Sequence, residues 1–258
     1  MTEANKSDLI VIKVGTGVLT RVEDGRLDGG ALVKLVTALS ELIRQGHRVV
    51  LVSSGAVGSG VSALGLDSYP KTLPEKRAAA AVGQARLMHT YENLFSQFEL
   101  SVAQILLTGN NLKSDKVRPR VKKTIDCLLA KGNVVPIVNQ NDSVAVEEIS
   151  KGDNDMMSVR VSELLNADLL VMLTSADGLC EGGVGGPLIP LVTSFEEARK
   201  QVGEVAGKFS IGGMSSKLNA VERAVGTGVR IVIGNGRRPE RLAEIVKGEG
   251  ICTRFLVE

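Results

Sequence analysis

The chain has 258 residues, of which 43% are hydrophobic and 23% charged, and its 31 lysines and arginines nearly balance 29 aspartates and glutamates. This composition is typical of a globular protein with a sizeable apolar core. No apolar run reaches the roughly 18 residues of a membrane span, and the polar start is unlike a signal peptide, so we expect a cytoplasmic protein without membrane contact. With a net charge of +2, 3% aromatic residues and no Trp, nucleic acid is not expected as a partner. Three scattered cysteines indicate neither a disulfide framework nor a zinc site.

Apolar periodicity predicts strands that alternate with helices along the whole chain. Strands are predicted at 8–14, 47–53, 101–108, 134–138, 168–174 and 229–233, and helices at 30–45, 75–98, 117–131, 155–166, 195–205 and 214–226. A further helix and a closing strand are expected within 239–258. Strands separated by helices of this length need crossover connections, which predicts an α/β fold with a mostly parallel sheet covered on both faces. No linker marks a boundary, so residues 1–258 are predicted to form a single domain.

Small, polar and glycine residues follow one predicted strand after another. These segments are Lys13 with Gly15 to Gly17, Ser53 to Ala56, Asn139 to Asp142, Thr174 with Ser175, and Gly234 to Gly236. Ligands of open parallel sheets bind beyond the carboxyl ends of the strands. Glycines there let a ligand approach the backbone, and free N–H groups ahead of a helix suit a phosphate. The P-loop, the dinucleotide fingerprint and the GxSxG elbow are all absent from the sequence.

Each of these segments also has a structural interpretation. Lys13, in an apolar strand, needs an anionic partner if it is buried, but it could also lie at a frayed strand end and reach water. Ser53 to Gly60 is typical of a flexible strand-to-helix turn, and Asn139 to Asp142 of a turn rich in Asx residues.

Two predicted helix starts contain polar or charged residues that helix capping does not explain. Gly152 to Asp155 holds three successive residues able to cap a helix, where one suffices, and the surplus indicates a bound cation or polar ligand. Gly212 to Lys217 places a lysine in a first turn, where it opposes the helix dipole. A phosphate bound at that turn would reverse the sign of the interaction.

Six blocks in this order, IKVGTGVLT, VSSGAVGSG, AAAVGQARLM, VPIVNQNDSV, KGDND and GGMSSKLNAV, resemble the amino-acid kinase family from Lys13 to about Gly236. The resemblance implies the αβα sandwich of that family, as one amino-acid kinase domain without a C-terminal domain of the RNA-binding type. It implies transfer of the γ-phosphoryl group of ATP, with Mg²⁺, to the side-chain carboxylate of L-glutamate for proline synthesis. A carboxylate acceptor is ionised at pH 7, so this reaction needs no general base.

The same resemblance implies a role for individual residues. Lys13 and Lys217 are expected to contact the transferring phosphoryl group, with Asp155 positioning both lysines. Asp142 is expected to bind the substrate ammonium group, and Ser54, Asn154 and Asn139 to bind its oxygen atoms or lie beside it. The nucleotide is expected on Lys13, Gly15, Thr174, Ser175, Ile211, Gly212, Gly213, Met214, Ser215, Ser216 and Lys217. No metal ligand from the protein is predicted, because the ATP phosphates would hold the Mg²⁺.

The resemblance also implies proline as a feedback inhibitor, a homodimer or homotetramer, and functional coupling to glutamyl phosphate reductase. Two alternatives stay open. Gln140 stands where the family has an acidic residue, which favours another acceptor, such as N-acetylglutamate, aspartate or a phosphorylated small molecule. Ser175 stands where an acidic residue is expected near the nucleotide, which favours a non-catalytic amino-acid sensor.

Overall fold

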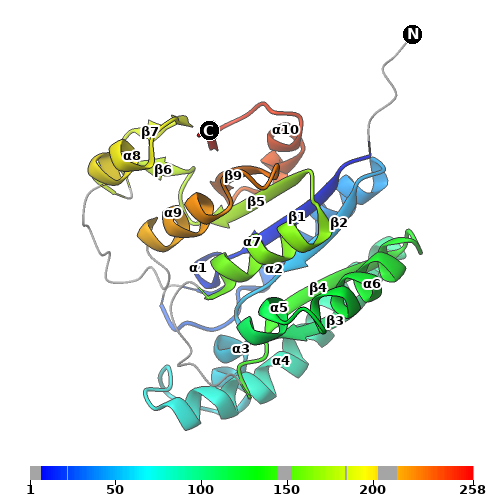
Figure 1. Cartoon of the computed structure of the whole chain (residues 1–258). Helices are drawn as coiled ribbons and strands as arrows, with labels where there is room; N and C mark the ends of the chain where they lie inside the picture. Colours follow the sequence, from blue (N-terminus) through cyan, green and yellow to red (C-terminus); the bar gives the residue numbers. More distant parts are fainter. Residues whose placement is uncertain (1–6, 22, 145–152, 184, 203–213, 258) are drawn as a thin grey trace.

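The computed structural model describes residues 7–257 except for 22, 145–152, 184 and 203–213. An eight-stranded sheet in the order β3-β4-β2-β1-β5-β9-β10-β8 runs through the molecule, with helices on both faces (Figure 1). Its strands are β1 (Leu9–Val14), β2 (Arg48–Val52), β3 (Ser101–Leu107), β4 (Val134–Gln140), β5 (Leu169–Thr174), β8 (Leu191–Val192), β9 (Arg230–Asn235) and β10 (Cys252–Phe255). A separate hairpin pairs β6 (Leu179–Cys180) with β7 (Leu188–Ile189).

The helices belong to two layers and a few short connections. They are α1 (Thr16–Leu19), α2 (Gly29–Arg44), α3 (Ala56–Ala63), α4 (Leu73–Phe95), α5 (Gly109–Lys113), α6 (Arg118–Leu129), α7 (Asp153–Leu165), α8 (Phe195–Val202), α9 (Met214–Arg223) and α10 (Leu242–Val246), with 3-10 turns at Ser96–Phe98 and Pro239–Arg241. Within the described part of the chain, no helix is both long and apolar enough to cross a bilayer.

The sheet is parallel from β3 to β9, and β10 runs antiparallel to β9. β1 lies in the middle, and Lys13 is in register with Val52 on β2 and Met172 on β5. The predicted αβα sandwich with a mostly parallel sheet is therefore confirmed. A parallel sheet brings the carboxyl ends of β1, β2, β4, β5 and β9 to one edge, which is where a ligand site is expected.

Strand β1 divides the core into two layers because its side chains alternate between the faces of the sheet. Leu9 and Val11 pack into the layer that contains α6, α7, α8 and α9, and Ile10 and Ile12 pack into the layer that contains α2, α4 and α10. All six residues of β1 are buried, as a strand covered on both faces requires.

The segments that form α3 and α4 differ from their sequence interpretation. The glycine-rich stretch predicted as a flexible turn is helix α3, which begins directly after Gly55. The backbone of Gly55 has φ of 97°, a left-handed conformation that turns the chain sharply from β2 into the helix. The predicted helix over 75–98 begins earlier, at Leu73, because Thr72 and Glu75 form a capping box.

Helices α3 and α4 pack backbone against backbone. A Cβ atom built at Gly60 would overlap the carbonyl group of Ala79 on α4, and one built at Gly83 would overlap the carbonyl group of Ala56 on α3. The two glycines therefore allow an approach that no other residue permits. This contact fixes α4, and with it Gln84, beside the residues that follow β2.

Gly60→Ala should therefore force the two helices apart and lower the free energy of unfolding by about 2 kcal/mol or more, the size of an overpacking defect. Urea denaturation followed by circular dichroism measures the change. Gly29→Ala is the matched control, because it adds the same methyl group at the start of α2 where no atom lies within 4 Å. If both variants unfold like the wild type, the helix contact is not tight.

Candidate active site at the carboxyl edge of the sheet

The carboxyl edge of the sheet gathers the polar residues that follow the strands. Lys13 lies near the end of β1, Ser53 and Ser54 follow β2, and Asn139 lies near the end of β4. The first turns of α7 and α9 reach this edge from the layer above β1, where the two helices lie side by side (Figure 1). Segments separated by more than 200 residues in sequence are thus brought to one place.

Two lysines from distant parts of the chain contact one aspartate. Lys13 Nζ lies 2.5 Å from Asp155 Oδ1, and Lys217 Nζ lies 3.4 Å from Asp155 Oδ2. Ser216 Oγ also donates a hydrogen bond to Oδ2, at 3.2 Å. The side chains of Lys13, Lys217 and Asp155 are only 6%, 7% and 1% exposed. The buried interpretation of Lys13 is confirmed, and Asp155 is its anionic partner.

The charges in this cluster do not cancel, since two ammonium groups share one carboxylate. Burial alone would raise the pKa of Asp155, but the Lys13 and Lys217 charges and their hydrogen bonds hold that pKa below its ordinary value. Burial, helped by the charge of Lys13, lowers the pKa of Lys217, and Asp155 opposes this shift. A buried surplus of positive charge is costly on its own, so the cluster favours a bound anion.

An adjacent cluster consists of neutral polar groups. Asn154 Nδ2 lies 3.0 Å from the carbonyl oxygen of Ser53, 3.0 Å from Ser54 Oγ and 3.2 Å from Asn139 Oδ1. Because Asn154 and Asp155 are neighbours at the start of α7, one helix turn connects the neutral cluster to the charged one. Their side chains thus serve contacts across the sheet edge, which explains the surplus of polar residues at this helix start.

The remaining predicted residues are distributed around this edge. Gly15 follows β1, where an added Cβ would lie 3.4 Å from Lys13 Nζ, so the glycine keeps the space beside the ammonium group open. Thr174 ends β5 and accepts a hydrogen bond from the backbone of Gly236, while Ser175 is exposed. Met214, Ser215 and Ser216 form the first turn of α9. Ile211, Gly212 and Gly213 lie outside the described residues.

Asp142 lies just beyond the end of β4 and is partly buried. Burial, with a further contribution from the Asp142 carboxylate, raises the pKa of Tyr69, which places this phenol in the field of the carboxylate. Tyr69 belongs to the connection between α3 and α4, so this connection reaches the same edge.

The sequence interpretation did not single out Gln84 at this edge, and it included Ser53 only as part of the segment that follows β2. Ser53 is fully buried and its Oγ lies 2.9 Å from the hydroxyl group of Tyr91. Gln84 is 9% exposed and accepts a hydrogen bond from Asn139 Nδ2 at 2.8 Å. A signal existed for Gln84, because it occupies the apolar stripe of α4 with Ala80, Leu87 and Tyr91, where an amide needs a partner.

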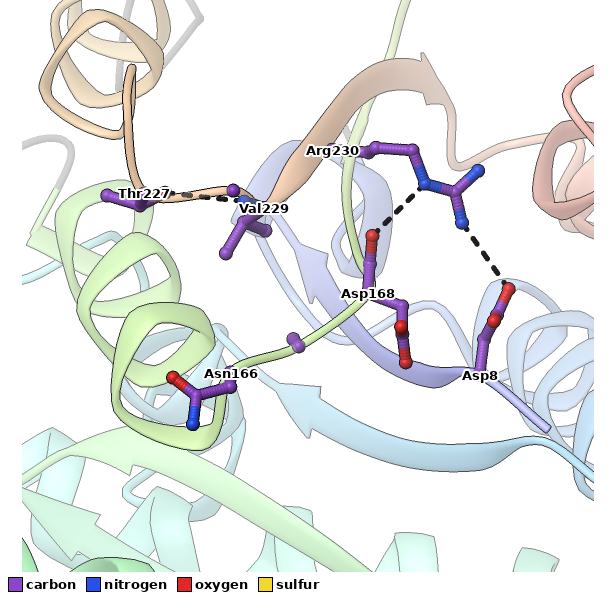
Figure 2. Close-up of a pocket in the computed structure, with 8 residues that line it drawn as sticks. Asp8, Asn166, Asp168, Thr227, Val229 and Arg230 are labelled. Carbon is purple, nitrogen blue, oxygen red and sulfur yellow. Dashed lines mark hydrogen bonds and ion pairs between the residues drawn. The ribbon is translucent and has the colours of Figure 1, made fainter. Parts of the chain in front are cut away.

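A pocket of about 540 Å³ lies at the opposite edge of the sheet, at the amino ends of β1, β5 and β9 (Figure 2). Arg230 bridges this edge, donating to the carbonyl oxygen of Asp168 at 3.2 Å and to Asp8 Oδ2 at 3.4 Å. The pocket contains none of the residues predicted to bind substrate or nucleotide. Its arginine already meets oxygen atoms of the chain itself, so the carboxyl edge is the candidate active site.

Known proteins of similar sequence match nearly the whole chain. The model of the amino acid kinase family matches residues 8–235. The glutamate 5-kinase of Clostridium acetobutylicum is 43% identical over 252 residues, which cover 96% of this chain and 94% of that protein. The glutamate 5-kinase of Synechocystis sp. is 43% identical over 261 residues, which cover 99% of this chain and 69% of that protein.

Solved structures with the same fold are more distant in sequence. Carbamate kinase from Giardia lamblia bound to AMP-PNP superposes with a TM-score of 0.66 at 13% identity, over 98% of this chain and 99% of that chain. UMP kinase from Ureaplasma parvum superposes with a TM-score of 0.62 at 16% identity, over 97% of this chain and 99% of that chain. The similarity supports the fold alone.

The charged cluster predicts a pH-dependent stability defect. Asp155→Asn removes the negative charge that contacts two buried ammonium groups and should lower the free energy of unfolding by about 3 to 5 kcal/mol at pH 7. The defect should shrink as the pH rises above about 9, because a buried lysine then loses its proton in the folded state before it does so in the unfolded state. Urea titrations at pH 7 and above about pH 9 measure the difference in unfolding free energy between the variant and the wild type.

Glu196→Gln, which breaks an exposed ion pair with Lys200, is the matched control and should leave stability nearly unchanged. If the loss of unfolding free energy in Asp155→Asn does not change with pH, the loss of charge balance is not its cause.

Proposed function

Because the chain belongs to the amino acid kinase family, we propose that it phosphorylates the side-chain carboxylate of L-glutamate with ATP. The product is L-glutamyl 5-phosphate, and the reaction is the first step of proline biosynthesis. The observation that supports this function most directly is the pair of buried ammonium groups, Lys13 and Lys217, at one carboxylate on the ligand-binding edge of the sheet. The chain is thus a phosphotransferase with a carboxyl group as acceptor.

Two lysines suit this reaction because phosphoryl transfer depends on positioning and charge. The carboxylate of glutamate attacks the γ-phosphorus in line, the bond to the β-phosphate oxygen breaks, and ADP leaves. Negative charge on the equatorial oxygens is met by Lys13 and Lys217, which already stand in a buried site and need no reorganisation. Asp155 holds both ammonium groups at fixed positions through its two carboxylate oxygens.

Magnesium is part of this proposal as the complex of the cation with ATP. The two lysines and one aspartate leave the site with surplus positive charge, which fits a polyanion. When bound, Mg²⁺ neutralises and orients the phosphates. ATP phosphates are proposed as its main ligands, because Mg²⁺ in such sites is usually bound through substrate phosphates.

The amino acid is proposed to bind at the neutral cluster beside the lysines. Ser54, Asn139 and Asn154 supply hydroxyl and amide groups near the start of α7, and Asp142, just beyond the end of β4, is proposed to add a carboxylate. Glycine at position 15 and the first turn of α9 are proposed for the nucleotide, together with Thr174 and Ser175. Ile211 to Gly213 are also proposed to bind the nucleotide; this part of the proposal rests on the sequence, because these residues lie outside those described.

The other expectations from the resemblance also stand as proposals. These are the cytoplasmic location, the single-domain organisation of residues 1–258, self-association, feedback inhibition by proline and coupling to glutamyl phosphate reductase. Addition of proline to the activity assay and light scattering of the purified protein test two of them directly.

The proposed activity is tested by incubating the purified protein with ATP, Mg²⁺ and L-glutamate and trapping the acyl phosphate with hydroxylamine. We expect glutamyl hydroxamate, formed together with ADP. N-acetylglutamate and aspartate in parallel reactions test the other acceptors. If glutamate gives no hydroxamate while another acid does, the acceptor is wrong. If no acid reacts but glutamate binds by calorimetry, the protein is a sensor.

Lys217→Ala should lower kcat by at least about a hundredfold, because it removes one preorganised charge donor from the transition state. The hydroxamate assay at saturating ATP and glutamate measures kcat. Lys200→Ala is the matched control, since Lys200 is an exposed lysine paired with Glu196 on α8, and it should stay within about twofold of the wild type. A near-normal rate for Lys217→Ala would remove this lysine from the mechanism.

A further inference from the structure

Four amide side chains form a continuous hydrogen-bonded series that leads from the surface to the substrate cluster. Gln84 Nε2 donates to Gln104 Oε1 at 2.9 Å, and Asn139 Nδ2 donates to Gln84 Oε1 at 2.8 Å. Asn154 Nδ2 lies 3.2 Å from Asn139 Oδ1. We call these residues the amide relay. It joins β3, α4, β4 and α7, and Gln104 at its outer end is exposed.

The direction of the amide relay is set by the backbone at its inner end. The N–H group of Gln140 can only donate, and it points to Asn139 Oδ1 at 2.8 Å. The oxygen of Asn139 must therefore face this N–H, and its Nδ2 must face Gln84. The carbonyl oxygen of Ser53 can only accept, so the atom of Asn154 that faces it at 3.0 Å must be Nδ2.

With the amide groups oriented in this way, one polar atom of the relay lacks a hydrogen-bond partner among the described residues. Asn154 Oδ1 is buried and has no hydrogen-bond partner among the described residues. A buried carbonyl oxygen without a donor is costly, and in a candidate site such an atom fits a ligand that supplies the donor. Because Nδ2 already meets three acceptors, Asn154 can offer the substrate only an acceptor.

We propose that Gln84 is a positioning and specificity-determining residue. It holds Asn139 in the orientation that the N–H group of Gln140 requires, and Asn139 in turn helps to hold Asn154 with its carbonyl oxygen toward the α-ammonium group of the substrate. The inference rests on the proposed function, since the ammonium group is that of an amino acid. Asn154 thereby joins Asp142 in recognising the amino end of glutamate. Ser54 Oγ accepts from Asn154, and no described residue accepts the Ser54 hydrogen, so this hydroxyl can donate to the substrate carboxylate.

The position of Gln84 fits this role. The contact of Gly83 with the backbone of α3 fixes that turn of α4, so the Gln84 side chain starts from a rigid point. Its burial would cost free energy without hydrogen bonds, and both of its amide atoms have partners. If Gln84 served only to stabilise the fold, its substitution would lower the stability of the protein but would not change its preference among substrates.

The test compares L-glutamate with glutarate, which has the same reacting carboxylate but no amino group, in the hydroxamate assay. For Gln84→Met we expect an increase of about tenfold in KM for glutamate, with kcat and the KM for ATP changed less than about twofold. The ratio of kcat/KM for glutamate over glutarate should fall by about tenfold. Gln104→Leu, which removes the exposed end of the same relay, is the matched control and should leave this ratio within about twofold.

The outcomes are distinct. An unchanged ratio for Gln84→Met, with kcat and both KM values altered alike, would overturn the inference and leave the proposed function standing. No hydroxamate from the wild type would overturn both. If Gln84→Met does not fold, Gln84→Ala, which also removes the acceptor and is a good helix former, is judged by the same ratio.

Discussion

The ion contacts of Asp155 are the interaction on which the candidate site depends. This one carboxylate, 1% exposed, binds the ammonium groups of Lys13 on β1 and Lys217 on α9. Without it, two positive charges would face each other in a buried place, and without them the carboxylate would be buried alone. The cluster therefore ties the middle strand of the sheet to helices α7 and α9, and in the proposed reaction it sets the charge that meets the transferring phosphoryl group.

The parallel sheet makes this arrangement possible. Because β1, β2, β4 and β5 all end at one edge, the residues that follow them meet there although they are far apart in sequence. Alternation along β1 covers both faces of the sheet with core, so only the strand ends remain for polar chemistry. Backbone contact between α3 and α4 at Gly60 and Gly83 fixes the turn of α4 from which Gln84 contacts Asn139.

The candidate site consists of a charged cluster and an adjacent hydrogen-bonded cluster. The lysines lie where phosphoryl charge develops in the proposed reaction, and the amide relay lies where the amino acid is proposed to bind. Asn154 and Asp155 are adjacent residues of α7, so the same helix turn serves both halves. Asn154 is bonded to Asp155, which contacts both lysines. A substrate whose amino end binds Asn154 would therefore lie at a fixed distance from the lysines, as phosphoryl transfer requires.

The sequence by itself determined the alternation of strands and helices, the parallel sheet and the edge at which the site lies, because apolar periodicity and crossover length are local properties. It also indicated that Lys13 needs an anionic partner. The resemblance implied Asp155 as the residue that positions both lysines. Only the tertiary structure decided that Asp155 contacts them through its two carboxylate oxygens, that the glycine-rich segment after β2 is helix α3, and that Gln84 lies beside Asn139. These facts depend on backbone contacts and on amide directions fixed by Gln140 and Ser53, which arise between segments remote in sequence, and no local pattern encodes them.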